Sequence, residues 1–420
     1  MSWILRARAR AHRLFVPRPN LEAQNIRNLY AEIGWFGILS GITTSFLSVY
    51  TLRVGGSDTH IGLLSSLPAL IISLASLPGS RLVEREKKPL SVMMLSATLH
   101  RFGYLAIALV PFFFTTSRAD VIVALVALLT IPQAIASVAF TTMFARAVPP
   151  DKRARVVSVR NVWIGITTTL AAFFGGKFLD WVIFPINYQI LFALGFATAL
   201  VNLYYLARIR LPAAPVEPRR SETPQGVRAL LAMLRAQRGF VRFTVSSFVF
   251  HWGMFFVGPL YTIYWVRNLQ ATEGWIGLFS VIANATTIFF FPIWARIATR
   301  FGNRAVMIGS AAGLALYPFC TAFAPTVEWI LGVSLLGGVF TAGFSLSFFN
   351  GLLEISPEQN RASYIAAYNS FVNLAAFASP IVSTSLTSLF TIPALLLFGA
   401  GLRLFGALMI WQQRVLVKTR

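Results

Sequence analysis

The sequence predicts an all-α membrane protein in which twelve transmembrane helices form two homologous six-helix halves. Three observations predict this fold class. Of the 420 residues, 56% are hydrophobic and only 12% are charged, and the mean hydropathy is +0.68. Apolar stretches of about 20 residues recur along the whole chain, which excludes a soluble enzyme with one membrane anchor. The basic residues gather in alternate loops, as they do in multi-pass membrane proteins.

Each predicted helix is an apolar run long enough to cross roughly 30 Å of hydrocarbon, which takes about 20 residues. In chain order the twelve runs are residues 29–52, 60–80, 90–114, 120–144, 157–180, 188–208, 241–265, 274–297, 304–323, 328–351, 362–389 and 392–413. The domain division that follows is a basic tail (1–28), an N-terminal six-helix bundle (29–208), a linker (209–240), a C-terminal six-helix bundle (241–413) and a second tail (414–420).

The segments outside the bundles are basic. Residues 1–28 are rich in arginine, as in either a transit peptide or a tail lying on the membrane surface. The same preference for arginine over lysine runs through the other loops on that side, which favours a cytoplasmic tail. The linker begins with prolines and ends with a short basic amphipathic helix, which we expect to lie against anionic lipid headgroups.

The charge distribution predicts the topology. The chain has 36 Lys and Arg against 14 Asp and Glu, a net charge of +22. If the N-terminus is cytoplasmic, 30 of the 36 basic residues fall on that side and four (Arg53, Arg118, Lys177 and Arg267) fall on the other. Cytoplasmic loops retain Lys and Arg, so this asymmetry predicts that both termini are cytoplasmic. The positive charge therefore reflects topology and does not indicate a nucleic-acid partner.

The two halves carry an internal repeat. At an offset of 215 residues, Asp58 to Ser65 aligns with Glu273 to Ser280, and both copies place an acidic residue before an Ile-Gly-Leu entry into a span. At an offset of 208 residues, Arg153 to Asn161 aligns with Arg361 to Asn369. Two homologous six-helix units are the simplest explanation of both alignments.

These features resemble the Major Facilitator Superfamily over the whole chain. That family carries Gly-x-x-x-Asp-Arg-x-Gly-Arg-Lys between its second and third helices, and the corresponding loops here are Ser80 to Lys88 and Ala295 to Arg304. The resemblance implies two parallel-repeat halves around a substrate site near the membrane midplane. It also implies transport of a small organic solute by alternating access. The drug-antiporter motifs of helices 4 and 5 and the sugar-porter signatures are missing, so the subfamily stays open.

The resemblance also implies a gate at the loop after the second helix. There Glu84, beside Arg85, would form a bond that holds one side closed, with Arg153 or Arg146 as its partner. Arg300 and Arg361 occupy the related loops of the second half. A solvated loop that only obeys topology is the alternative, and it is favoured for Lys87 and Lys88.

Among the charged or titratable residues of the predicted spans we single out four, because an ionisable group inside a span is costly and usually functional. Glu32 is near the start of the first helix, as either a coupling residue or one that reaches the interface. His251, beside Trp252 in the seventh helix, is either a coupling residue or a packing residue. Arg101 and Arg403 are expected to be structural, bonded within their own halves. Glu32 and Arg101 are not expected to pair, since their predicted depths differ by about 12 Å.

Polar amides on the expected cavity helices are candidates for binding an organic solute, although helix-to-helix hydrogen bonding explains each of them equally well. They are Gln133, Asn161, Asn284, Asn350, Asn369 and Asn373, and the candidate aromatic wall is Trp35, Phe140, Trp163, Trp252 and Phe348. No nucleotide-binding loop, cofactor motif or metal-ligand cluster is found, and Cys320 is the single cysteine.

We therefore expect a monomeric secondary transporter in a bacterial cytoplasmic membrane, with a small solute and possible coupling to protons. The alternatives are a uniporter and a receptor or scaffold that does not transport. Catalysis is not expected, because the four histidines are scattered and form no catalytic constellation.

Overall fold

The computed structural model describes residues 21–85, 89–211, 237–357 and 361–412. These residues form twelve helices long and apolar enough to span a membrane, and none of them lies in a strand, which confirms the predicted fold class. The N-terminal half comprises α2 (Leu21–Arg53), α3 (Asp58–Arg85), α4 (Pro89–Phe113), α5 (Arg118–Ala147), α6 (Pro150–Trp181) and α7 (Ile186–Ala207). The C-terminal half comprises α9 (Arg238–Ile263) with its π-helical extension η1 (Tyr264–Asn268), α10 (Glu273–Phe301), α11 (Asn303–Ala322), α12 (Trp329–Ile355), α13 (Arg361–Ser385) with the 3₁₀ turn η2 (Leu386–Ser388), and α14 (Ile392–Gln412).

Two helices begin earlier than the hydropathy of the sequence predicts. Helix α2 begins at Leu21 instead of residue 29, and α6 begins at Pro150 instead of residue 157. The first turns of α2 are too polar to be read as a span. Two hydrogen bonds anchor these turns to the segment after α7. The Asn25 side chain donates to the Arg210 carbonyl (2.8 Å) and accepts from the Arg210 backbone N–H (3.0 Å). Proline at the first position of α6 is favourable there because its missing N–H has no partner to lose.

These earlier starts correct one prediction about charge. Arg160, one of the 30 basic residues counted above on the cytoplasmic side, lies ten residues into α6 and is buried. The predicted tail, the linker with its amphipathic helix and the C-terminal tail fall largely on residues 1–20, 212–236 and 413–420, outside the described residues.

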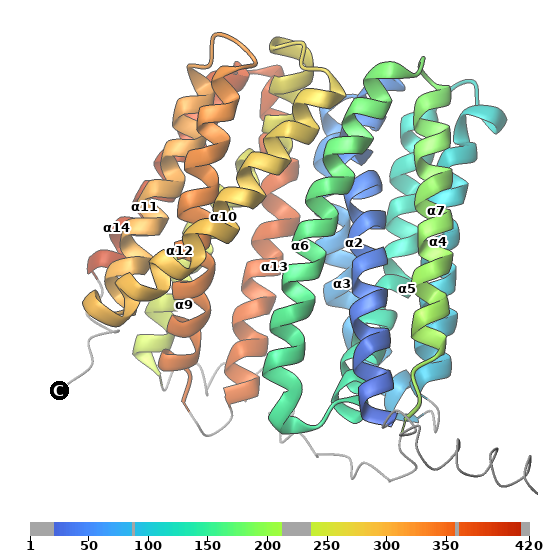
Figure 1. Cartoon of the computed structure of the whole chain (residues 1–420). Helices are drawn as coiled ribbons and strands as arrows, with labels where there is room; N and C mark the ends of the chain where they lie inside the picture. Colours follow the sequence, from blue (N-terminus) through green and yellow to red (C-terminus); the bar gives the residue numbers. More distant parts are fainter. Residues whose placement is uncertain (1–20, 86–88, 212–236, 358–360, 413–420) are drawn as a thin grey trace, which may run out of the picture.

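The molecule has two distinct ends, which are the lower and upper ends in Figure 1. We call the end where α2 begins and α14 ends the basic end. The opposite end, where α2 connects to α3 and η1 connects to α10, is the far end.

The two halves pack together through α6 against α10 and α3 against α13 (Figure 1). Where α6 crosses α10 the backbones are close enough to require glycine. A Cβ added to Gly277 would lie 2.6 Å from the Ala172 carbonyl oxygen, and one added to Gly176 would lie 2.6 Å from that of Glu273. Two glycines, one from each half, therefore allow this contact between the halves.

The hydrophobic core differs between the two ends. One buried cluster contains side chains of both halves, including Tyr50, Tyr188 and Ile263, and lies toward the far end. At the basic end, a cluster around Leu29 and Met143 belongs to the N-terminal half, and a separate cluster around Phe243 and Tyr364 belongs to the C-terminal half. The apolar packing that joins the halves is therefore concentrated at the far end.

Candidate functional site

The centre of the N-terminal half contains a buried cluster of charged and amide side chains. Glu32 of α2 forms an ion pair with Arg160 of α6, and both side chains are at least 90% buried. Asn202 of α7 donates to Glu32 Oε2 (2.8 Å) and accepts from Arg101 of α4, from Nη2 at 2.8 Å and Nε at 3.0 Å. Four helices thus meet through one hydrogen-bonded network, in which every bond involves a charged group and is stronger for it.

This network overturns the expectation that Glu32 and Arg101 lie at different depths. Helix α2 begins at Leu21 and α4 at Pro89, so Glu32 and Arg101 are eleven and twelve residues from their helix starts. At 1.5 Å per residue these depths are about 16 and 18 Å. Both helices run from the basic end to the far end, which brings the two charges to the same level, where Asn202 bridges them.

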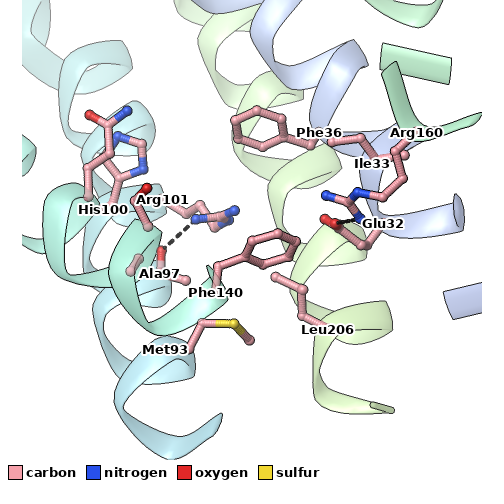
Figure 2. Close-up of a pocket in the computed structure, with 13 residues that line it drawn as sticks. Glu32, Ile33, Phe36, Met93, Ala97, His100, Arg101, Phe140, Arg160 and Leu206 are labelled. Carbon is pink, nitrogen blue, oxygen red and sulfur yellow. Dashed lines mark hydrogen bonds and ion pairs between the residues drawn. The ribbon is translucent and has the colours of Figure 1, made fainter. Parts of the chain in front are cut away.

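The charged cluster borders a cavity of about 280 Å³, which we call the N-half cavity. Figure 2 shows the Arg101 guanidinium and the Phe36 and Phe140 rings around it, with the Glu32–Arg160 pair opposite His100. The Arg160 guanidinium lies over the Phe140 ring, 4.8 Å from its centroid, and that of Arg101 lies 5.8 Å from the Phe36 centroid. The remaining lining residues are Ile33, Met93, Ala97, Gln133, Ala136, Ser137 and Leu206.

The centre of the C-terminal half is aromatic. His251 of α9 has its Nδ1 2.8 Å from the Ser247 carbonyl oxygen, to which it donates. Its ring is in contact distance of five aromatic rings, those of Phe250, Phe255, Phe344, Phe348 and Tyr368. The neighbouring residue, Trp252, accepts a hydrogen bond at its carbonyl from Ser379 of α13 (2.7 Å) and has its ring beside Phe248. This environment supports packing more than proton exchange for His251.

Arg403 is the buried arginine of the C-terminal half. It donates to the carbonyl oxygens of Leu314 (2.7 Å) and Met254 (3.4 Å), both in its own half. Arg101 likewise bonds within its own half, to Asn202 and to the Ala97 carbonyl (3.2 Å). The two arginines differ in that only Arg101 belongs to a network that contains a carboxylate.

The other predicted amides are spread over the molecule. Gln133 is near Glu32, on the wall of the N-half cavity. Asn350 lines a second cavity, of about 810 Å³, at the basic end of α10, α11 and α12, together with Asn303, Arg304 and Glu354. The side chains of Asn161 and Asn369 are exposed, and those of Asn284 and Asn373 are half-buried.

The predicted gating residues lie at the basic end. Glu84 and Arg85 are in the last turn of α3, but their side chains, and Lys87 and Lys88, lie outside the described residues. Arg153 donates to the carbonyls of Val148 (3.0 Å) and Ala145, so its side chain caps the C-terminal end of α5. Arg300 is exposed, with its guanidinium 5.2 Å from the Phe301 ring centroid, and Arg361 is half-buried at the start of α13.

A set of polar contacts that the sequence reading missed joins the halves at the far end. Arg53, at the end of α2, pairs with Glu273, at the start of α10 (3.0 Å), and Arg267 of η1 pairs with Asp58, at the start of α3. We call these two ion pairs the far-end lock. Each pair joins an arginine at the end of one half's first helix to an acid at the start of the other half's second helix, so the pairs are reciprocal.

Further hydrogen bonds strengthen the contact around Glu273. Tyr188 donates to Glu273 Oε1 (2.9 Å), and Arg53 Nη2 donates to the Ala271 carbonyl (3.3 Å). Asp180, at the end of α6, accepts from the Gly274 amide and the Thr272 hydroxyl, both at 3.0 Å. The sequence signal was available: Asp58 and Glu273 are matched residues of the repeat, and Arg53 and Arg267 are among the four basic residues assigned to this side.

Comparison with known proteins shows the family. The model of the Major Facilitator Superfamily matches residues 34–261 and 243–416. The multi-drug resistance efflux pump PmrA of Streptococcus pneumoniae is 27% identical over 150 residues, 34% of this chain and 37% of the pump. The staphyloferrin B transporter of Staphylococcus aureus is 26% identical over 172 residues, 39% of this chain and 41% of that transporter. The matched segments thus span well under half of these relatives.

Solved structures share the fold over nearly the full chain. A variant of the nucleoside transporter NupG superposes with a TM-score of 0.74 at 14% identity, covering 94% of this chain and 100% of the other. The D-xylose-proton symporter superposes with a TM-score of 0.67 at 16% identity, covering 93% and 97%. With twelve spanning helices and a family match from residue 34 to residue 416, the chain belongs to the Major Facilitator Superfamily of membrane transporters.

Proposed function

We propose that the protein is a secondary active transporter that moves a small organic solute across a bacterial cytoplasmic membrane by alternating access. The observation that carries the proposal is the contrast between the ends. Charged and apolar contacts join the halves at the far end, while the buried apolar clusters of the basic end stay within single halves. A carrier closed on one side of its substrate site has this arrangement.

The charge asymmetry gives the orientation in this proposal. The basic end carries most of the Lys and Arg residues of the loops, so it faces the cytoplasm and the far end faces outward. The structure is then the inward-facing state, closed outside by the far-end lock. Cysteines placed at the exposed residues Thr116 (far end) and Asp151 (basic end), in a Cys320→Ser background, test this orientation. An impermeant maleimide added to intact cells should label the first and spare the second.

The reciprocity of the lock supports rocking of two rigid halves. Each half supplies one arginine and one acid, so a rotation of one half against the other breaks both pairs together. Only interactions that differ between the two states shift their balance, and the lock residues interact only when the far end is closed. Breaking the lock should therefore favour the outward-open state.

The relatives support transport of organic solutes. The similar proteins include a multi-drug efflux pump, a siderophore transporter, a nucleoside transporter and a proton-coupled sugar symporter. We propose proton coupling through Glu32, because it is the acidic residue buried at the centre of the described spans. Its carboxylate is bonded to Arg160 and Asn202, whose side chains can form other hydrogen bonds when Glu32 is protonated. His251, bonded to its own helix and enclosed by rings, is the weaker candidate.

Solute flux into proteoliposomes tests the proposal against a receptor or scaffold of the same fold. Purified protein should accelerate entry of a radiolabelled solute from a panel that contains organic acids, nucleosides and sugars. The control is the Asp58→Lys/Glu273→Lys variant, which places a lysine opposite each arginine of the lock. Repulsion between these like charges should prevent closure of the far end and so suppress the transport cycle. Absence of flux for every solute in the panel, by folded protein, would contradict transport.

A further inference from the structure

The charges around the N-half cavity do not balance. Among the described residues that line it, three are charged: Arg101 and Arg160 each carry a guanidinium group, and Glu32 carries a carboxylate. Arginine stays protonated in proteins, so the lining carries an excess of one positive charge. An uncompensated charge is expensive in the middle of a membrane, and such a group usually has a functional partner. An anion in the cavity would supply the missing charge.

Both arginines keep hydrogen-bond donors that no described residue uses. Arg160 donates through Nη1 to Glu32 and to the Leu29 carbonyl (2.8 Å), which leaves Nε and Nη2 without an acceptor. Arg101 donates once from each of its three nitrogens, to Asn202 and Ala97, which leaves one N–H on each terminal nitrogen. Planar guanidinium groups with two free N–H donors suit the two oxygens of a carboxylate.

The rest of the cavity suits the organic part of such an anion. The Phe36 and Phe140 rings lie beside the two guanidinium groups (Figure 2), and Ile33, Met93 and Leu206 add apolar surface. Gln133 and Ser137, two exposed residues of α5, add polar groups to the lining. A cavity of about 280 Å³ is near the lower limit for small-molecule sites, which span roughly 300 to 1,000 Å³. It therefore fits a small molecule or one end of a larger one.

We propose that the N-half cavity is a binding site for an organic carboxylate, held between Arg101 and Arg160 with its apolar part against Phe36 and Phe140. This inference rests on the proposed function, because it names the chemical class of solute that the transporter recognises. The depth of the site, about 16 Å from the start of α2, argues against a lipid headgroup as the anion. At the centre of the C-terminal half, the described residues are arranged differently: Arg403 donates to backbone carbonyls, and the residues whose rings lie near His251 are all aromatic.

Glu32 has a specific part in the proposal. It is bonded to Arg160, so it competes with the ligand for the same guanidinium. Replacing Glu32 with glutamine would free Arg160 and raise the positive charge of the cavity. Anion binding should therefore become tighter in this variant, a change that a purely structural network would not produce.

Calorimetric titration of the purified full-length protein with benzoate tests the site, and benzamide serves as the neutral probe of nearly the same shape. Benzoate should bind and benzamide should bind at least tenfold more weakly. Arg101→Gln and Arg160→Gln should each weaken benzoate binding by about tenfold to a hundredfold, the value of one charge-assisted hydrogen bond. Glu32→Gln should strengthen it. Arg118→Gln is the matched control, because it removes one guanidinium at the far end, outside the cavity.

The outcomes separate this inference from the proposed function. Equal binding of benzoate and benzamide, or benzoate affinity that is unchanged in folded Arg101→Gln and in Glu32→Gln, would overturn the carboxylate site. If either arginine variant does not fold, the Glu32→Gln variant still decides: tighter benzoate binding supports the site, and unchanged or weaker binding overturns it. Flux of other solutes in proteoliposomes without charge-selective binding would retain the transporter and reject the site. Selective binding of benzoate without flux of any solute would retain the carboxylate site and reject the transporter.

Discussion

The two halves of the molecule have the same six-helix framework and different centres. In the N-terminal half, Glu32, Arg101, Arg160 and Asn202 form a buried charged network beside a cavity. In the C-terminal half, His251 is enclosed by aromatic rings, and Arg403 relies on backbone carbonyls. Both halves thus share an acidic start of the second helix and take part in the reciprocal far-end lock, while their centres differ. Polar recognition of solute is accordingly expected from the N-terminal half.

The largest effect expected from this difference concerns stability. Arg160→Gln leaves Glu32 buried without its ion-pair partner, which should cost about 3–5 kcal/mol. Arg403→Gln should cost less, about 1–3 kcal/mol, because it removes donors from two carbonyls and strands no charge. Thermal midpoints in detergent should fall in that order. The double variant Glu32→Gln/Arg160→Gln should recover part of the lost stability. If its loss of stability equals the sum of the losses in the two single variants, the two residues are not coupled.

A second effect should separate the two pairs of the far-end lock. Glu273 is 8% exposed and accepts from both Arg53 and Tyr188, whereas the Arg267–Asp58 pair is more exposed, at 45% and 18% of its side chains. Exposed pairs contribute about 0.2–1 kcal/mol, and hydrogen bonds to buried charged groups about 1.5–3 kcal/mol. Glu273→Gln should therefore open the far end much more than Asp58→Asn does. The rate of maleimide labelling at a cysteine exposed only when the far end opens measures this, and equal rates would contradict the ranking.

The smallest effect is expected at His251. His251→Phe replaces one ring by another among five aromatic neighbours, so it should leave substrate-driven proton movement in proteoliposomes nearly unchanged. Glu32→Gln should abolish that movement while benzoate binding persists. Wild-type coupling in Glu32→Gln, or lost coupling in His251→Phe, would move the proton site to the C-terminal half.

The sequence was sufficient to predict the twelve spans, the two halves and the matched helix starts at Asp58 and Glu273. Hydropathy and charge placement act along the chain, so one sequence records them. The same reading placed Glu32 too near the membrane surface and counted Arg160 with the basic residues of the cytoplasmic side, because polar first turns hid the true starts of α2 and α6. The partners of Arg53, Arg101 and Arg160 lie on other helices, 220, 101 and 128 residues away. Packing between helices sets such contacts, and no local pattern encodes them.

Distances between spin labels at both ends test most directly the claim that the far-end lock closes one side of a rocking transporter. Labels at Thr116 and Thr326 report on the far end, and labels at Asp151 and Thr299 report on the basic end, each pair joining the two halves through exposed residues. The background is Cys320→Ser, with and without Asp58→Asn/Glu273→Gln. The account predicts that breaking the lock lengthens the far-end distance and shortens the basic-end distance in the same sample. Unchanged distances, or distances that lengthen together at both ends, would contradict it.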